Sequence, residues 1–355
     1  MMYALVGVVL AFGWVGISYK TKDQNSDYYL VFAGLVLLLF MGLRGDFTTD
    51  YGNYANSFSS YSTLSFGDIA RIKREPLFAL LIKFTSLFSQ HFQVYHFLMS
   101  ALVCIPAILA IRKSSKNYVL SVFFLFALTY YIESFNITRN CIAMSFLLFG
   151  LHYIEEKKPI LWILCVVLAT GFHTSAIVLL PLYLLNYLPV NRKSLLLYTI
   201  FVLCVVLGYE YVLRFAQQRL GLYGNYTGNS YGMWAQEWVS ISKKRLLVRT
   251  SIYIAYFSLL LRKRNLVDSG IYIAIVSLAV YMVQFRLFMV YRFDLYLFGF
   301  FITLFPNKFE QSEFPPKVRR ILIIAIIGLS IIWVSSAYGG EYYPFWQNTV
   351  VKQPL

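Results

Sequence analysis

Residues 118–154 read YVLSVFFLFALTYYIESFNITRNCIAMSFLLFGLHYI, two apolar runs on either side of a short polar segment. The runs, Tyr118–Glu133 and Cys141–Ile154, approach the ~20 residues that a helix needs to cross a bilayer. A charged side chain at mid-bilayer costs roughly 2.5 to 3.5 kcal/mol, so Arg139 between the runs requires a partner or a water-filled cavity. The stretch therefore predicts two membrane-spanning helices with a polar segment at a membrane edge.

Apolar runs of this kind recur along the whole chain. Of the 355 residues, 59% are hydrophobic and only 13% are charged, and the mean hydropathy is +0.63, values that no soluble globular domain shows. At ~20 residues per span, we expect an all-α polytopic integral membrane protein with about 12 transmembrane helices. No linker or fixed-period repeat divides the sequence, so residues 1–355 are predicted to form a single transmembrane domain. The runs are residues 2–19, 28–43, 94–111, 118–133, 141–154, 159–170, 175–188, 194–213, 246–261, 269–285, 290–306 and 321–338.

The net charge of +15 has a topological explanation. Most of the cations form clusters in every second loop, which the positive-inside rule assigns to the cytoplasm and which places both termini outside. There is no basic domain or recognition motif that would bind nucleic acid. The basic loops contain Lys20 and Lys22, Arg112 to Lys116, Lys157 and Lys158, Arg192 and Lys193, Arg262 to Arg264, and Lys308 to Arg320.

This topology predicts two larger outer loops, residues 44–90 and 209–245. Within the first, Glu75–Gln90 is short and interrupted by Lys83, so it must lie in the outer interface or re-enter instead of crossing. The second carries Gly, Asn, Tyr and Trp between Tyr223 and Trp234. Such residues offer turns and flat faces with polar tips that suit sugars, although an aromatic belt at the interface has the same composition.

Ionisable side chains gather at the edges of five apolar runs, and the alternating topology brings most of them to the outer side. Arg44 can cap helix carbonyls or snorkel to headgroups, but Asp46 and Asp50 follow it closely and favour a binding site. The carboxylate of Glu75 can cap the first turn of a helix that starts at Pro76. The segments are Arg44–Tyr51, Glu75–Phe78, Asn136–Asn140, Gly171–Ser175 and Tyr291–Asp294.

The remaining edge residues also allow two interpretations. Arg139 can pair with Glu133, but six residues is not a helical contact spacing, which leaves an anionic ligand open. His173 lies at a break between two runs, either as a hydrogen-bonded structural residue or as a group that accepts a proton near neutral pH. Arg286 and Arg292 flank the turn after the 269–285 run, and Arg292 can simply pair with Asp294.

No motif predicts a cofactor or a metal. The four cysteines, which all lie in apolar runs, lack the paired spacing of a zinc site or a disulfide framework. The sequence also contains no phosphate-cradling glycine loop, nucleophile elbow or metal-ligand cluster. Metal-independent chemistry is therefore expected.

Taken in order, the motifs resemble those of the EpsG family of Wzy-type polysaccharide polymerases. The resemblance covers roughly the whole chain and is strongest from Gly42 to Tyr183. One departure is Asn140, where the family pattern has Gln. The motifs are Gly42–Asp46 with Asp50, Tyr51 and Tyr54, then Glu75–Phe78, Asn136–Asn140 with Ala143, Phe172–Ala176 with Pro181–Tyr183, and Tyr291-Arg292.

The resemblance implies a membrane glycosyltransferase that polymerises oligosaccharide repeat units carried on undecaprenyl diphosphate, at the outer face of the bacterial cytoplasmic (inner) membrane. Membrane lipids and a chain-length-regulating co-polymerase are the further partners that it implies. The residue chemistry agrees, because arginine forks can stabilise the negative charge that develops on a lipid diphosphate. The arginines in question are Arg44, Arg139, Arg286 and Arg292.

Roles for the other site residues follow from the same chemistry. The acceptor sugar hydroxyl needs a base, for which His173 is the first choice and Asp50 or Glu75 the second. Asp46, Tyr51 and Tyr54 would orient sugars, and Asn136, Tyr291 and Asp294 complete the predicted substrate-binding set. Two alternatives remain open, namely a transporter or flippase of lipid-linked oligosaccharide and a membrane O-acyltransferase. The first should distribute its charges through the midplane or on both faces, and the second leaves the several outer arginines and acids without a role.

Overall fold

The computed structural model describes residues 2–46, 48–128, 130–208, 211, 247–261, 268–284 and 290–337. These residues are mainly helical and contain no β-strand, as the apolar runs predicted. Of the predicted outer loop 209–245, all but Tyr211 lies outside the described residues, and so does Arg286.

The chain divides into two compact units, Met1–Leu180 with Gly299–Leu355, called unit 1, and Pro181–Phe298, called unit 2. The single domain predicted for residues 1–355 stays a prediction.

The helices of unit 1 are α1 (Met2–Thr21), α2 (Asp27–Gly42), α3 (Thr49–Ser62), α4 (Phe66–Ala70), α5 (Pro76–Ser86), α6 (Phe92–Ser114), α7 (Tyr118–Ala127), α8 (Tyr130–Glu133), α9 (Thr138–Glu155), α10 (Pro159–Phe172), α16 (Phe301–Gln311) and α17 (Pro316–Ala337). Unit 2 contains α11 (Arg192–Leu207), the helix Leu247–Leu261 and α14 (Gly270–Val283), while the 3₁₀ helix η1 (Thr174–Tyr187) and α15 (Tyr291–Gly299) run across the two unit boundaries.

The fold is that of an all-α polytopic membrane protein. Three helices, Met2–Thr21, Phe92–Ser114 and Pro316–Ser336, are long and apolar enough to cross a membrane by themselves, and shorter apolar helices accompany them. The number of about 12 spans stays a prediction. Helix α5 has 11 residues and is about 16 Å long at 1.5 Å per residue, too short for a bilayer core of ~30 Å. Other helices in predicted spans are short as well, for example α7 with 10 residues, so whether Glu75–Gln90 crosses stays a prediction.

The interior of unit 1 is built around α9, which packs between α6 and α10. Helix α2 lies on α6, and α1 contacts both α2 and α17, so the two ends of the described chain are neighbours. Buried apolar side chains such as Ile142, Met144 and Leu148 fill the contacts of α9. Large apolar side chains remain exposed on other helices, for example Phe12 at 73% and Ile160 at 77%. Such exposure suits helices that face lipid instead of water.

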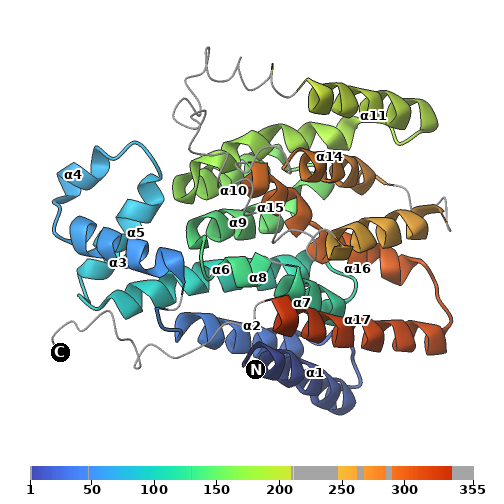
Figure 1. Ribbon diagram of the computed structural model, residues 1–355, viewed down its shortest axis with the longest axis horizontal. Helices are drawn as coiled ribbons and strands as arrows, with labels where there is room; N and C mark the ends of the chain where they lie inside the picture. Colours follow the sequence, from blue (N-terminus) through green and yellow to red (C-terminus); the bar gives the residue numbers. More distant parts are fainter. Residues whose placement is uncertain are drawn as a thin grey trace. The chain divides into compact units, whose positions relative to one another are not determined.

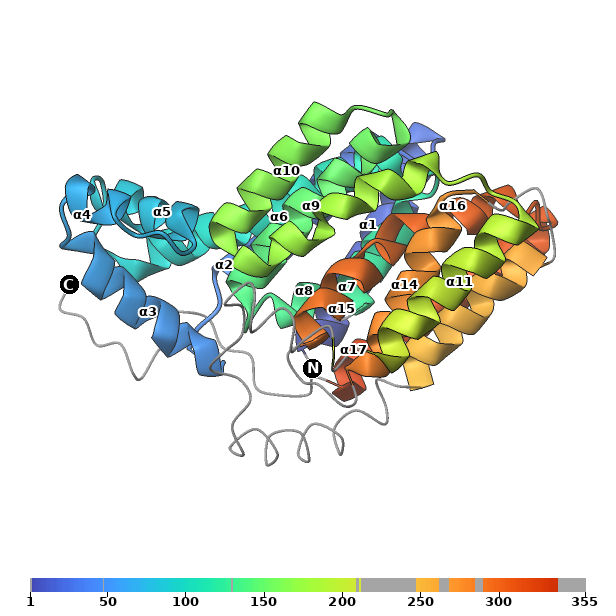
Figure 2. The same ribbon diagram turned by 90° about the horizontal axis from the view of Figure 1, so that it is seen from above.

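One end of unit 1 carries α3, α4 and α5, which lie together beyond the longer helices (Figures 1 and 2). Helices α3 and α4 both contact α5, and α5 also contacts α10. Aromatic rings fill the space beneath α3, where Phe58 stacks on Tyr95 at 5.3 Å between ring centroids and Tyr51 meets Phe92 at 5.1 Å. This small helical layer covers the ends of the spans where the predicted site residues lie.

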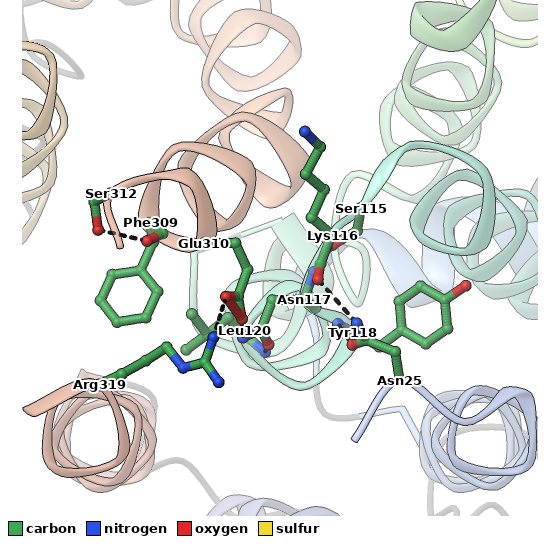
Figure 3. Close-up of polar contacts among 10 residues, drawn as sticks. All are labelled: Asn25, Ser115, Lys116, Asn117, Tyr118, Leu120, Phe309, Glu310, Ser312 and Arg319. Carbon is green, nitrogen blue, oxygen red and sulfur yellow. Dashed lines mark hydrogen bonds and ion pairs between the residues drawn. The ribbon is translucent and has the colours of Figure 1, made fainter. Parts of the chain in front are cut away.

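The opposite end of unit 1 is held by polar side chains (Figure 3). The amide of Asn25 donates to the carbonyl of Lys116 (2.9 Å) and accepts the N–H of Tyr118 (2.9 Å). Asn307 accepts the N–H of Lys116 (2.7 Å) and donates to the carbonyl of Ser114 (2.6 Å). Two asparagines from opposite ends of the sequence therefore satisfy the backbone of the 114–118 loop. Three of the predicted basic loops meet at this end.

Candidate functional site

The backbone of Glu75 has an unusual conformation that decides where its carboxylate goes. Glu75 precedes Pro76 at the start of α5 and has φ 56°, in the left-handed region. Residues before proline normally adopt extended conformations, and a left-handed residue other than glycine costs about 1–3 kcal/mol. Its side chain makes no capping hydrogen bond to α5. The predicted alternative, that Glu75 caps its own helix, is therefore wrong.

The Glu75 carboxylate instead joins α9 and α10. Its Oε1 lies 2.7 Å from Nδ1 of His173, and its Oε2 lies 2.5 Å from Nη1 of Arg139. The carboxylate is only 7% exposed. Burial by itself would raise the pKa of Glu75, but the His173 hydrogen bond, the positive charge of Arg139 and the backbone N–H of Thr174 together hold this pKa below its usual range. Glu75 is therefore ionised at neutral pH.

His173 reaches Glu75 because α10 and α5 approach each other closely. A Cβ on Gly171 would lie 2.5 Å from Cγ of Leu77, so only glycine fits at this crossing. His173 follows as the C-cap of α10, with an extended backbone, and its side chain is 9% exposed. When a neutral imidazole donates from Nδ1 to a carboxylate, Nε2 is the basic nitrogen. The Glu75 contact therefore favours the tautomer that a general base needs.

We expect Gly171→Ala to reduce the polymerisation that the family resemblance implies, by separating His173 from Glu75. The added methyl group must displace Leu77 on α5, and a misplacement of about 1 Å near a reactive group can cost ~100-fold in rate. Polymer yield and membrane-inserted protein should be measured together. Gly52→Ala is the matched control, since nothing lies within 4 Å of a Cβ at that exposed glycine. Equal activity of both variants would contradict this account of the crossing.

Arg139 lies in the first turn of α9 and has aromatic rings beneath it. Its guanidinium carbon is 4.7 Å from the ring centroid of Phe78 and 5.7 Å from that of Tyr54, within the range of cation–π attraction. The side chain is 38% exposed. The structure pairs Arg139 with Glu75, so the predicted pair between Arg139 and Glu133 is wrong. Arg139 is thus oriented by one acid while part of its guanidinium faces outward.

Arg44 is fully buried, unlike Arg139. It donates to Oγ1 of Thr48 (2.8 Å) and to the carbonyl of Phe135. Its guanidinium carbon also lies 5.4 Å from the Tyr51 ring centroid. These contacts fix the segment after α2 against the turn before α9. Arg44 therefore shapes the site from inside the protein.

The remaining predicted residues of unit 1 surround Arg139 or support it. The side-chain oxygen of Asn136 accepts the N–H of Asp50 (3.0 Å), which brings the first outer loop to the Arg139 turn. The hydroxyl of Tyr54 accepts the backbone N–H of Arg139 (3.4 Å), and burial raises the pKa of Tyr54, so its phenol stays protonated. Tyr51 is buried and donates to Oε1 of Gln93 (3.2 Å).

Two more residues of this turn and loop differ in exposure. Asp46 is partly exposed, after the end of α2. Asn140, where the family pattern has Gln, is buried, and neither atom of its amide has a hydrogen-bond partner among the described residues. A longer side chain would carry its amide further from the helix, so the shorter Asn changes what this position can reach.

Unit 2 contains a buried ion pair that sequence reasoning missed. Asp294 is fully buried and pairs with Arg249, which is 3% exposed and lies 4.5 Å from the Phe298 ring centroid. The predicted alternative, a pair between Arg292 and Asp294, is wrong, since residues two positions apart on a helix do not face each other. Arg292 is partly exposed on α15 and Tyr291 is buried beside it. The sequence feature that could have indicated this ion pair is Arg249 itself, a charged residue within the 246–261 apolar run that requires a partner.

The helical fold and the acid–arginine–histidine cluster at the edge of the spans define a polytopic membrane protein with a polar site at one end of unit 1. A family model described as the EpsG family matches residues 27–347, and the chain therefore belongs to this family. Membership indicates an enzyme of polymerase type in polysaccharide biosynthesis. No curated protein and no solved structure matches the chain. Within the described ranges, no three His, Cys, Asp or Glu side chains are grouped so that they could hold a metal ion.

Proposed function

We propose that this protein is a Wzy-type glycosyltransferase that joins oligosaccharide repeat units carried on undecaprenyl diphosphate. Family membership supports polysaccharide polymerisation. The observation that supports a reaction on a lipid-linked substrate is that the partly exposed Arg139 and the imidazole of His173 both contact the buried carboxylate of Glu75. An anion-binding group and a base, side by side at the edge of a membrane domain, match a reaction on a lipid diphosphate.

In the proposed reaction, the hydroxyl of the acceptor sugar gives its proton to Nε2 of His173. The electron pair that remains on the acceptor oxygen forms a bond with the anomeric carbon of the donor. The bond from that carbon to the diphosphate breaks, and the lipid diphosphate leaves with the electron pair. Arg139 stabilises the negative charge that develops on the leaving group, through the part of its guanidinium that faces outward. Release of this proton from His173 then restores the base.

The charge distribution supports an outer position for the site. The loop that contains Lys116 lies at the end of unit 1 opposite to Glu75, together with the basic chain that contains Lys308 and Arg319. Loops rich in Lys and Arg remain in the cytoplasm under the positive-inside rule. The Glu75 cluster then faces the outside of the cytoplasmic membrane, where lipid-linked repeat units meet the growing chain.

Further residues have supporting roles in this proposal. Asp50, Tyr54 and Asn136 lie around Arg139 and would contact the sugars next to the diphosphate. Arg292 supplies an additional partly exposed cation in unit 2. Arg286 is a further candidate, outside the described residues. Membrane lipids surround the exposed apolar helices, and a chain-length-regulating co-polymerase is the proposed protein partner.

The test is a reaction with purified protein and one lipid-linked substrate. Protein in proteoliposomes should convert undecaprenyl-diphosphate-linked repeat units into a ladder of longer chains and release undecaprenyl diphosphate, without any nucleotide sugar. A gel ladder and the released lipid diphosphate should appear together, since each bond formed frees one carrier. Movement of intact substrate across the bilayer without release of the carrier would contradict the proposal and indicate transport.

A further inference from the structure

Among the described residues, Glu75 contacts both the proposed base and the proposed anion-binding residue. Each carboxylate oxygen contacts a different partner, Oε1 with His173 at 2.7 Å and Oε2 with Arg139 at 2.5 Å. These partners lie 98 and 64 residues away in the sequence. The left-handed backbone at φ 56° directs the side chain away from its own helix. Such a costly conformation is maintained only where the surrounding structure determines it.

One negative charge is therefore shared between two groups whose charges change during the proposed reaction. A neutral His173 donates a hydrogen bond to the ionised Glu75, which also forms an ion pair with Arg139. When His173 accepts a proton, its contact with Glu75 becomes an ion pair as well, so the attraction between two opposite charges is added to the hydrogen bond. The carboxylate is then attracted more strongly to His173 than before. The ion pair between Glu75 and Arg139 weakens correspondingly, because the Glu75 carboxylate is buried and both contacts compete for its one charge.

We propose that Glu75 is a positioning residue that couples proton transfer at His173 to anion binding at Arg139. The inference rests on the proposed function for the identity of the anion, a lipid-linked diphosphate. As the acceptor proton reaches His173, Glu75 releases Arg139 toward the leaving diphosphate, which gains its negative charge at the same step. The base and the anion-binding arginine thus act together without touching each other.

Linkage makes this coupling reciprocal. If protonation of His173 strengthens diphosphate binding, then diphosphate binding must favour the protonated His173 by the same factor. In the part of the chain that the structure describes, charged and titratable groups approach this pair from several helices. Glu75 faces His173 from α5, Arg139 approaches Glu75 from α9, and Tyr54 of α3 and Tyr95 of α6 lie near Arg139. Both tyrosines are buried, and imidazole is the only side-chain type in this cluster whose ordinary charge change falls between pH 5 and 8.

The experiment measures the affinity of purified protein for a farnesyl diphosphate sugar at pH 6 and pH 8. A diphosphate diester is chosen because a terminal phosphate would itself titrate near pH ~6. The wild type should bind about fivefold or more tightly at pH 6, the lower end of typical couplings between sites. Glu75→Gln and His173→Ala should each reduce this pH effect to less than about twofold.

Two further variants distinguish the proposed coupling from a purely structural role of Glu75. Asp68→Asn removes a carboxylate whose ion pair with Arg71 is exposed, and it should retain the wild-type pH effect. Glu75→Asp keeps the charge but is one methylene shorter, so it can hold only one partner and should lose the pH effect. This variant keeps the test decisive if Glu75→Gln does not insert. Each protein is first checked for a monodisperse elution profile.

Direct attraction between a protonated His173 and the diphosphate would survive in Glu75→Gln. An unchanged pH effect in that variant, or no pH effect in the wild type, would therefore overturn the coupling. The proposed function is judged separately, by the polymer ladder. A wild-type protein that makes polymer while its affinity ignores pH would refute only the role of Glu75, whereas absence of polymer would refute the function itself.

Discussion

His173→Ala is expected to abolish visible polymer while single lipid-linked repeat units accumulate. General-base catalysis typically contributes ~10²- to 10⁴-fold to a rate, and the loss of this factor leaves too few coupling events for a ladder. Folding should be affected less, since the Glu75 carboxylate keeps its ion pair with Arg139 and the N–H of Thr174. Lipid-linked intermediates and inserted protein should be measured in the same cells.

His91→Ala is the matched control for this variant. His91 is exposed at the start of α6 and makes no capping hydrogen bond, so its removal should leave the ladder unchanged. A different base would give a different pattern. If His173→Ala makes full-length polymer and Asp50→Asn does not, the base is a carboxylate of the first outer loop, and His173 has a structural role only.

Arg139→Lys is expected to reduce polymerisation by about a hundredfold, the cost of removing one well-placed donor from an anion-stabilising site. Lysine keeps the positive charge but loses the planar fork that binds two oxygens at once. It also loses the flat face that lies 4.7 Å from the Phe78 ring centroid. The rate of carrier release with saturating substrate should be measured, because the effect is expected on the chemical step more than on binding.

The control for this variant is Arg71→Lys. Arg71 belongs to the same outer segment, but its side chain is 83% exposed and pairs with Asp68 on the surface. Exposed pairs of this kind contribute ~0–1 kcal/mol to stability, so the substitution should change neither protein level nor rate. Full activity of Arg139→Lys would remove the support for a bidentate arginine at the diphosphate.

The positions of the helices could be predicted from the sequence because burial in lipid demands long apolar runs, which are local features. The same logic placed Arg139, Glu75 and His173 at the ends of such runs, and these residues do lie at one end of unit 1. The segment after Glu75 forms an 11-residue helix, and its position outside the bilayer core stays a prediction. Each of these conclusions depends only on residues that are close together in the sequence.

The contacts among the site residues could not be predicted in this way. Glu75 lies 98 residues from His173 and 64 from Arg139, and which helices become neighbours depends on packing of the whole unit. Helix capping is a local rule and gave the wrong role for Glu75, because its left-handed backbone directs the carboxylate elsewhere. Similarly, the short spacing of Arg292 and Asp294 suggested a pair, while the true partner, Arg249, lies on another helix.

The asparagine contacts at the opposite end of unit 1 have a consequence for the biogenesis of this protein. The N–H of Lys116 is bound by Asn307, which is made 191 residues later. While the ribosome synthesises the intervening chain, the N–H of Lys116 and the carbonyl of Ser114 must bind water instead of Asn307. The first helices are thus inserted early, but the contacts of Asn307 with their 114–118 loop form only after α16 has been synthesised. In the proposed topology, which places this loop in the cytoplasm, we expect a chain that stops before Asn307 to be cleaved more readily in the loop by cytoplasmic proteases, because the N–H of Lys116 lacks its side-chain partner.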